Sequence, residues 1–319
     1  MGAKRGRTMT APVLKPDADA IKKAATCLLE GGLVAMPTET VYGLAGDATN
    51  PDAVARIYRV KERPVFNPLI AHVASIETAF GQGRFSEAAR MLARHFWPGP
   101  LTLVVKATHT TTVCDLARAG LETLAIRVPA HPVARALLEA TGRPLVAPSA
   151  NPSGRISPTS AAHVAADLGT KLDFILDGGD CSEGLESTVI DARGEAPVLL
   201  RPGTISPNDI NAIWPGLTRG GEAGAPISPG QLLRHYAPNA RLRLNAAAPG
   251  PGEAYLGFGP GDATLNLSPS ASLTEAAANL FSMLRKLDET HDRIAVAPIP
   301  EAGLGLAIND RLERAANRD

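Results

Sequence analysis

The segment Lys61–His72, KERPVFNPLIAH, brings two cations, an amide and an imidazole together within twelve residues. Arg63 offers a planar fork of donors for phosphate oxygens and Lys61 offers a mobile point charge, which is the usual division of roles around a polyphosphate. Pro64 and Pro68 disfavour helix at the residues that precede them and hold the segment extended. A basic loop that is only solvated needs no such rigidity, so the pattern favours an anion-binding segment.

Another cation, Arg127, lies inside an apolar strand, in the sequence AIRVP at 125–129. A buried guanidinium without a partner is costly, so Arg127 needs either an internal carboxylate or an anionic ligand. The residues alone leave both partners open.

Further segments place hydroxyls, an amide and another arginine where strands end. They are PTETVYGL at 37–44, PSANPSGRISPT at 148–159, ESTVID at 186–191 and LLRPG at 199–203. Side chains at the carboxyl ends of strands commonly face a ligand crevice in α/β sheets, and a small-residue loop before a helix resembles an anion cradle. Each segment taken alone also fits a polar turn or a helix cap.

The composition excludes several classes of protein. Lys+Arg 32 balance Asp+Glu 32, so the 319-residue chain has a formal net charge of +0 and no global positive field for nucleic acid. Its three cysteines are far apart, which rules out a disulfide framework and a CxxC metal site and favours the cytoplasm. No apolar stretch approaches the ~18 residues of a membrane helix. We expect the basic start, MGAKRGRTMT, to be solvated and disordered.

A stretch rich in glycine and proline divides the chain. Residues 215–230 hold eight Gly or Pro in sixteen positions, which indicates an interdomain linker. The following RHYAP at 234–238 carries aromatic and charged side chains that a passive spacer does not need, so we expect it to fold onto a neighbouring surface. The sequence thus predicts a large domain at 10–215, an ordered linker at 216–239 and a small domain at 240–319.

Strand-like and helical segments alternate in both domains, which indicates an α/β architecture with a sizeable mixed sheet. The predicted strands of the large domain are Leu33–Met36, Leu101–Val105, Leu124–Val128, Leu145–Ala147, Phe174–Leu176, Thr188–Asp191 and Val198–Leu200, and its helices are Asp17–Glu30, Pro51–Arg59, Ser86–His95, Pro132–Thr141 and Thr159–Leu168. The predicted strands of the small domain are Arg241–Leu244, Ala254–Phe258 and Ile294–Ala297, and its helices are Thr274–Thr290 and Ile308–Ala316.

Eight motifs in one order span nearly the whole chain: PTETVYGL, KERPVFNPLIAH, FWPGPLTLV, LAIRVP, PSANPSGRISPT, ESTVID, LLRPG and RHYAP, followed by GLGLAINDRLERAA at 303–316. With this order the chain resembles the YrdC/YwlC family of threonylcarbamoyl-AMP synthases, in the long form with an extra C-terminal domain. The resemblance implies a large twisted mixed-sheet catalytic domain with a central cavity, joined by the linker to a small Rossmann-like α/β domain.

The resemblance also implies an activity. The family makes threonylcarbamoyl-AMP and pyrophosphate from L-threonine, bicarbonate or CO₂, and ATP, normally with Mg²⁺ held through the ATP phosphates. The product serves the modification of the adenosine beside the anticodon in tRNAs that read codons beginning with A, and a separate tRNA threonylcarbamoyl-transferase complex completes that step. A weak tRNA contact and a cytoplasmic location belong to this expectation.

Site residues follow from matching the family's motifs to this sequence. The residues expected to bind threonine are Thr40, His72, Arg127, Ala147 and Ser187. Those expected to bind ATP are Arg63, Asn67, Thr123, Ser149, Ser157, Arg201 and, from the linker, Tyr236. Lys61 and Arg63 are the expected catalytic residues, and Asn151 belongs to the same signature near the phosphates.

We expect a mechanism without a protein nucleophile. The N-carboxylate of threonine attacks the α-phosphorus of ATP, so positioning and charge neutralisation carry the catalysis, and the RHYAP stretch is the expected lid. Two alternatives stay open at this point. One is an RNA-binding module that uses the same cationic cavity, which the zero net charge disfavours. The other is the carbamoyltransferase chemistry of hydrogenase maturation, whose related domains lie in much longer chains.

Overall fold

The computed structural model of the chain describes residues 10–220 and 235–317. The basic start and residues 221–234 of the predicted linker, which include Arg234 of the RHYAP stretch, lie outside the described residues. Within the described ranges, every helix is too short or too polar to cross a membrane.

A twelve-stranded mixed sheet organises the large domain. Its order is β1-β9-β2-β3-β8-β4-β7-β6-β10-β11-β12, with β5 beside β6. The strands are β1 (Val13–Leu14), β2 (Val34–Met36), β3 (Gly43–Asp47), β4 (Ile70–His72), β5 (Gly83–Arg84), β6 (Leu101–Ala107), β7 (Thr123–Arg127), β8 (Leu145–Val146), β9 (Phe174–Leu176), β10 (Thr188–Asp191), β11 (Val198–Arg201) and β12 (Thr218–Arg219). The sheet confirms the predicted mixed α/β class.

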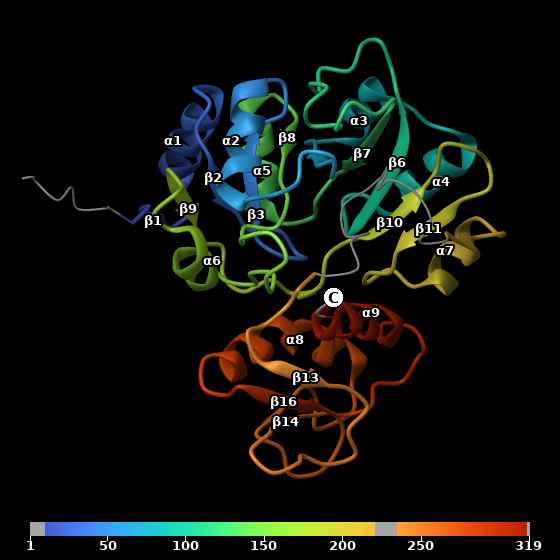
Figure 1. Ribbon diagram of the computed structural model, residues 1–319. Coiled ribbons are helices and arrows are strands. Elements are labelled where there is room, and N and C mark those ends of the chain that lie inside the picture. Colours follow the sequence, from blue (N-terminus) through green and yellow to red (C-terminus); the bar gives the residue numbers. More distant parts are fainter. Residues whose placement is uncertain (1–9, 221–234, 318–319) are drawn as a thin grey trace, which may run out of the picture.

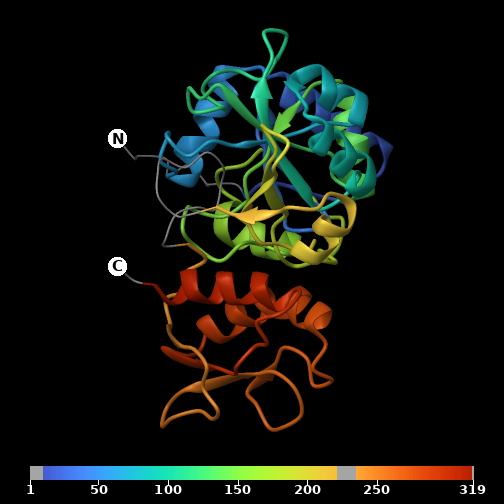
Figure 2. The same ribbon diagram turned by 90° about the vertical axis from the view of Figure 1, so that its right-hand side faces the viewer.

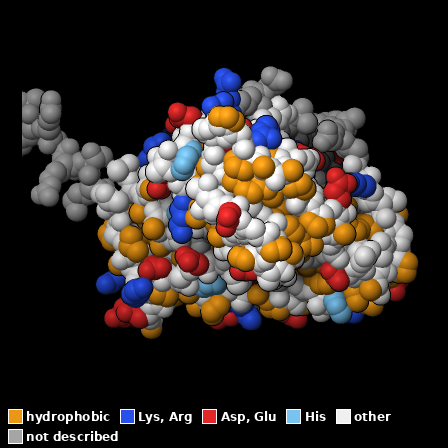
Figure 3. All heavy atoms as spheres, turned by 90° about the horizontal axis from the view of Figure 1, so that it is seen from below, with side chains coloured by type: hydrophobic (Ala, Val, Ile, Leu, Met, Phe, Trp, Pro, Cys, Tyr) orange, Lys and Arg blue, Asp and Glu red, His pale blue; other side chains and the backbone are white. Residues whose placement is uncertain are grey.

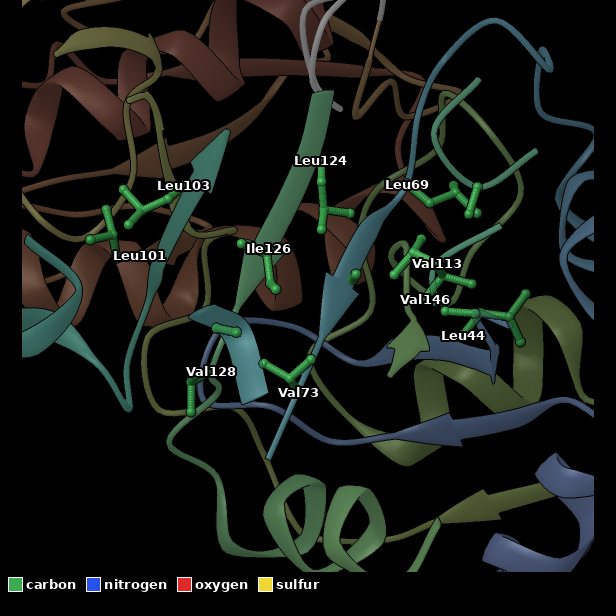
Figure 4. Close-up of a cluster of buried hydrophobic side chains, with 14 of the residues drawn as sticks. Leu44, Leu69, Val73, Leu101, Leu103, Val113, Leu124, Ile126, Val128 and Val146 are labelled. Atoms are coloured by element: carbon green, nitrogen blue, oxygen red, sulfur yellow. The ribbon is translucent and has the colours of Figure 1, made fainter. Parts of the chain in front are cut away.

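Helices cover both faces of this sheet (Figure 1). They are α1 (Ala18–Leu29), α2 (Pro51–Lys61), α3 (Ile76–Gln82), α4 (Glu87–Phe96), α5 (Pro132–Thr141), α6 (Ala161–Leu168) and α7 (Pro207–Ile213). Successive residues of β2 point to opposite faces: Val34 and Met36 pack with α1 and α5, whereas Ala35 packs in the cluster that holds α2, α4 and α6. Figure 4 shows part of that second cluster, with Leu103 of β6 and Ile126 of β7 among its members.

The small domain has a four-stranded, fully parallel sheet of order β13-β16-β14-β15, which matches the expected Rossmann-like character. Its elements are β13 (Arg241–Arg243), β14 (Ala254–Gly257), β15 (Leu265–Asn266), α8 (Leu273–Asp288), β16 (Arg293–Val296) and α9 (Gly305–Ala316). Helices α8 and α9 lie on the side of this sheet that faces the large domain (Figures 1 and 2). Val41, Ile156 and Leu185 of the large domain pack into the same hydrophobic core as these helices.

The domain interface therefore includes an apolar seam that continues the core of the small domain, and the ion pairs Arg285–Asp167 and Arg311–Glu186 cross it. On the opposite side, the small domain carries hydrophobic side chains among scattered acidic and basic ones (Figure 3). The described part of that face shows no dense gathering of Lys and Arg side chains of the kind that binds nucleic acid.

Several elements differ from the sequence expectations. The predicted helix start at Thr159 is wrong: Ser160 caps α6 and its side chain accepts from the backbone N–H of His163. Strands β3 and β4 fall at least partly within segments interpreted as turn and loop. Strand β3 pairs with the neighbouring β2 and with the distant β8, and β4 pairs with the distant β7 and β8. Strand β12, inside the predicted linker, pairs with β11 at the sheet edge. The domain boundaries themselves stay a prediction.

Candidate functional site

A cavity of about 490 Å³, open mouth included, lies where the ends of β4 and β7 meet the loops after β8 and before β10. The predicted site residues on its wall are Thr40, Arg63, His72, Arg127, Ala147, Ser149, Ser187, Arg201 and Tyr236. The wall also contains residues that the sequence analysis did not single out, namely Val41, Ile70, Pro148, Glu186 and His235.

Arg127, the last residue of β7, has an internal carboxylate as partner. Its Nη2 donates to Glu39 Oε1 at 2.6 Å, its Nη1 donates to Thr40 Oγ1 at 2.9 Å, and its Nε donates to the carbonyl of Gly99 at 3.1 Å. An internal carboxylate, one of the two partners that the sequence left open, is therefore present. Because a guanidinium has five N–H groups, these three bonds leave two for a ligand.

The hydroxyl of Thr40 has a fixed donor direction. Thr38 Oγ1 donates to the carbonyl of Val41 at 2.6 Å, so in the 2.8 Å contact between the two threonine hydroxyls Thr40 is the donor. Thr40 in turn accepts from Arg127. This chain of hydrogen bonds orients the PTETVYGL turn against Arg127 and accounts for its run of hydroxyl residues.

His72, at the end of β4, is a buried neutral imidazole. Burial, followed by the nearby charge of Arg127, lowers the pKa of His72 to about 3. Its Nδ1 lies 3.2 Å from the carbonyl of Ile70, so Nδ1 carries the proton and donates. The ring of His72 lines the cavity.

Arg63 precedes a turn in which the backbone N–H of Asn67 donates to the carbonyl of Pro64 at 3.2 Å, whereas the sequence predicted an extended segment. Its Nε donates to the carbonyl of Asn67 at 3.2 Å and its Nη2 donates to that of Pro68 at 3.0 Å. Burial lowers the pKa of Arg63 to about 10, so the side chain stays charged at neutral pH. The sequence-based interpretation of a rigid cationic loop is confirmed at this residue.

Asn67 lies behind Arg63 and is 1% exposed. Among the described residues its amide has no hydrogen-bond partner for either Oδ1 or Nδ2. A buried amide without partners costs free energy, so this side chain is suited to a polar ligand.

Lys61, at the end of α2, is buried behind the wall. Its Nζ donates to the carbonyls of Ser149 and Asn151, each at 2.5 Å. Burial, with the neighbouring charge of Arg63, lowers the pKa of Lys61 well below its ordinary value. Lys61 thus holds the PSANPSGRISPT loop in place, whereas the sequence suggested a group that contacts phosphate directly.

Ser187 and Arg201 form the opposite side of the cavity. Ser187 precedes β10 and Arg201 ends β11, and Arg201 Nη2 donates to the carbonyl of Ser187 at 3.0 Å and to its Oγ at 3.2 Å. The hydroxyls of Ser187 and Thr102 are 2.8 Å apart. The antiparallel pairing of β10 with β11 therefore brings a hydroxyl and a cation to one point.

Tyr236 closes the cavity from the chain that leads to the small domain. It is fully buried, and its ring stacks on Phe281 of α8 with centroids 5.4 Å apart. Its hydroxyl and Nδ1 of His235 have no hydrogen-bond partner within the described ranges. The expectation that RHYAP folds onto a surface is confirmed for His235 and Tyr236.

The remaining predicted residues lie off the wall. Ser157 Oγ donates to Glu186 Oε1 at 2.5 Å, immediately behind the lining. Asn151 Nδ2 donates to the carbonyls of Pro152 and Arg155, which shapes the loop. Thr123 begins β7, two residues before Ala125, which pairs with Ile70.

Two acidic residues and one distant arginine are functional candidates that sequence reasoning missed. Glu39 pairs with Arg127, and Glu186 lines the cavity and pairs with Arg311 of α9. Glu39 could have been found from the sequence, because it directly precedes the predicted threonine-binding residue Thr40. Nothing in the sequence near Glu186 points to a partner on α9.

The wall has the chemistry of an anion site. Arg63, Arg127 and Arg201 are 7%, 3% and 4% exposed, so their charges act inside the cavity and lie out of reach of a nucleic-acid backbone on the surface. Across residues 10–220 and 235–317, no group of three or more His, Cys, Asp and Glu side chains is arranged to hold a metal ion.

Comparison with known proteins gives the chain two family matches. Residues 26–203, more than half of the chain, match the Sua5/YciO/YrdC family, described as telomere recombination. Residues 205–317 match the family described as the threonylcarbamoyl-AMP synthase C-terminal domain.

Similar proteins cover almost the whole chain. Threonylcarbamoyl-AMP synthases of Bacillus subtilis and Pyrococcus abyssi are each 41% identical over 93% of this chain, which is 92% and 94% of their own lengths. The crystal structure of P. abyssi Sua5 complexed with L-threonine superposes with a TM-score of 0.88 at 39% identity, covering 96% of this chain and 97% of that one.

Proposed function

The chain belongs to the threonylcarbamoyl-AMP synthase family, and from that premise we infer that its cavity converts L-threonine, bicarbonate or CO₂, and ATP into threonylcarbamoyl-AMP and pyrophosphate. The observation that carries this inference is the convergence of Arg63, Arg127 and Arg201 on one cavity from three separate segments. One small carboxylate does not need three buried cations, but a carboxylate together with a triphosphate does.

We propose that threonine binds at the Arg127 side. The two free N–H groups of Arg127 face its carboxylate, and His72 lines the same cavity. Ser187 and the backbone of Ala147 complete the pocket. A structure of a relative with L-threonine bound supports this use of the fold.

We propose that ATP binds along the other side. Arg63, Arg201 and Ser149 face its phosphates, and Asn67, Tyr236, Ser157 and Thr123 serve the rest of the nucleotide. The unpartnered amide of Asn67 and hydroxyl of Tyr236, both buried, support this assignment in the described part of the chain. Lys61 acts by holding the loop that carries Ser149.

The chemistry then needs positioning more than a protein nucleophile. The amine of threonine adds to CO₂ to give an N-carboxylate and releases a proton. A carboxylate oxygen attacks the α-phosphorus, the bond between that phosphorus and the bridging oxygen breaks, and pyrophosphate leaves with the electron pair. The cations beside the triphosphate stabilise the negative charge that builds on the leaving group.

Mg²⁺ fits this arrangement as a companion of ATP. It prefers oxygen ligands and usually keeps several waters while it binds substrate phosphates. We propose that phosphate oxygens and waters hold it here, since the described residues supply no cluster of acidic ligands. When bound, it supplies additional neutralisation of phosphate charge.

The product is a mixed anhydride of a carbamate and a phosphate, which water hydrolyses. We propose that a tRNA threonylcarbamoyl transferase consumes it, with at most a weak contact of this chain to tRNA. The alternative of an RNA-binding module finds no support in the cavity, because its arginines are almost fully buried.

Pyrophosphate release from ATP tests the function. We expect release to require both L-threonine and bicarbonate, and D-threonine is the matched control because it has the same groups in the wrong geometry. Release that is independent of threonine would contradict the proposal.

A further inference from the structure

Arg311 of α9 belongs to the small domain, yet its guanidinium reaches the catalytic cavity wall from behind. The side chain is 0% exposed. Its Nε donates to Glu186 Oε2 at 2.9 Å, and its Nη1 donates to the carbonyl of Pro202 at 2.9 Å. It also lies over the ring of Tyr236, 5.3 Å from the centroid.

These contacts fall on residues next to the proposed ATP site. Pro202 directly follows Arg201, and Tyr236 lines the cavity. Glu186 lines the cavity too, and its other oxygen accepts from Ser157 at 2.5 Å. The Arg311 guanidinium thus contacts Tyr236 directly and reaches Ser157 through Glu186 and Arg201 through the neighbouring Pro202, all three of which are expected to bind the nucleotide.

The negative charge of Glu186 in the cavity wall is balanced by the positive charge of Arg311. A carboxylate in the wall of a site for a triphosphate repels the ligand when its charge is not balanced. Burial alone raises the pKa of Glu186, but the charges of Arg311 and Arg201 and the hydrogen bond from Ser157 outweigh burial and lower that pKa to about 2. Glu186 is therefore charged at neutral pH.

The compensation extends along α9. Arg311 Nη1 also donates to Asp310 Oδ2 at 2.6 Å, and Asp310 accepts from Arg314 at 3.0 Å. In this series of ion pairs two carboxylates alternate with two guanidinium groups. The charge of Arg314 therefore balances that of Asp310, and the charge of Arg311 balances that of Glu186. His235, the nearest imidazole facing Glu186, is neutral because burial lowers its pKa to about 3.

We propose that Arg311 is a positioning residue of the ATP site: the small domain supplies it to balance and orient Glu186, so that Ser157 and the Arg201 loop are held for the nucleotide. This gives the small domain a part in the reaction that takes place in the large one. The proposal rests on the proposed function for the identity of the nucleotide.

The test is a charge-rescue series on the full chain, with ATP binding measured by calorimetry in the absence of threonine. In Arg311→Met the carboxylate of Glu186 loses its ion-pair partner and keeps the nearby charge of Arg201, and we expect ATP to bind at least about tenfold more weakly. In Arg311→Met with Glu186→Gln, the unpaired carboxylate is removed together with Arg311, and we expect affinity to return to within about threefold of the wild type. A purely structural role for Arg311 would not be rescued by the second substitution.

The matched control is Arg243→Met, which breaks the exposed ion pair between Arg243 and Glu253 on the far side of the small domain. We expect it to leave ATP affinity unchanged. Wild-type affinity in Arg311→Met, or a double variant that binds ATP as weakly as Arg311→Met, would overturn the proposal.

Folding of the variants is followed by thermal unfolding. If Arg311→Met does not fold, the double variant decides: near wild-type ATP affinity supports charge compensation, and lost affinity in a folded double variant overturns it. If neither folds, Arg311→Lys decides, since lysine keeps the charge; a loss beyond about tenfold overturns the proposal. Formation of threonylcarbamoyl-AMP by the wild type is scored separately, so failure of the proposed function is distinguishable from failure of this inference.

Discussion

Arg127 and Glu39 form a buried ion pair in the cavity wall, with Nη2 and Oε1 2.6 Å apart and side chains that are 4% and 9% exposed. Burial alone raises the pKa of Glu39, but the charge and hydrogen bond of Arg127 outweigh it and lower the pKa. Glu39 also accepts from the backbone N–H of Ala130. The carboxylate therefore fixes the guanidinium plane and sets the direction in which its two free N–H groups face.

Replacing Arg127 separates its structural role from its ligand role. Arg127→Ala leaves Glu39 buried and unpaired, and we expect a loss of about 3–5 kcal/mol in the free energy of unfolding. It also raises the KM for threonine far more than the KM for ATP. Arg127→Ala with Glu39→Gln should regain most of the stability without regaining threonine binding. Chemical denaturation and steady-state kinetics measure the two effects, and equal increases in both KM values would show that Arg127 does not contact threonine.

Arg63 is expected to act on the nucleotide alone. Arg63→Ala removes a charged partner of the phosphates, and hydrogen bonds to charged groups contribute about 1.5–3 kcal/mol, which corresponds to roughly 10- to 160-fold weaker ATP binding. Threonine affinity should stay within about twofold, because Arg127 and His72 are untouched. Calorimetry with each substrate measures both. Wild-type turnover in the variant would remove Arg63 from the site.

Replacing Tyr236 by Phe removes only the hydroxyl group and leaves the ring in place. Tyr236→Phe keeps the stacking on Phe281 and removes a buried hydroxyl that has no partner among the described residues. Stability should be unchanged or slightly higher, while ATP binds about 2- to 10-fold more weakly, as for one neutral hydrogen bond of about 0.5–1.5 kcal/mol. Unchanged ATP affinity would contradict a contact between this hydroxyl and the nucleotide.

The stability of the protein should depend on pH through His72 and His235. Both have pKa values of about 3 in the fold because burial disfavours their charged forms. In the unfolded chain a histidine titrates near pH 6.5, so their contribution is complete above that pH and is lost as the pH falls from about 6.5 towards 3. Each lowers the free energy of unfolding by up to about 1.4 kcal/mol per pH unit in that window.

The control for this pH dependence is His72→Gln, which removes one of the two titrating groups. Denaturation at pH 7, 6 and 5 should give a shallower slope for the variant than for the wild type. Parallel slopes would show that His72 does not stay neutral in the fold.

Most elements and most of the cavity wall are predictable from the sequence, for a physical reason. The predicted strands are continuous apolar runs and the helices have marked starts, such as Asn50 before Pro51, so local signals suffice. The site motifs lie where these elements end, but the grouping of Arg63, Arg127 and Arg201 in one site comes from the resemblance to the family's motifs.

What the sequence could not predict depends on contacts between distant segments. Strand β4 has only three residues, and it forms a strand because it pairs with β7 and β8. The ion pair between Glu186 and Arg311 joins residues 125 positions apart in the sequence. The residue type of Lys61 predicts a phosphate ligand, and only the fold shows that its Nζ donates to two loop carbonyls.

The most direct test of the central claim is the mass of the nucleotide that forms from ATP, L-threonine and ¹³C-bicarbonate. We predict an adenylate that carries the threonylcarbamoyl group, with the ¹³C label in the carbamoyl carbon and one pyrophosphate released per adenylate. AMP without the threonylcarbamoyl group as the first product, or an adenylate without label, would contradict the account.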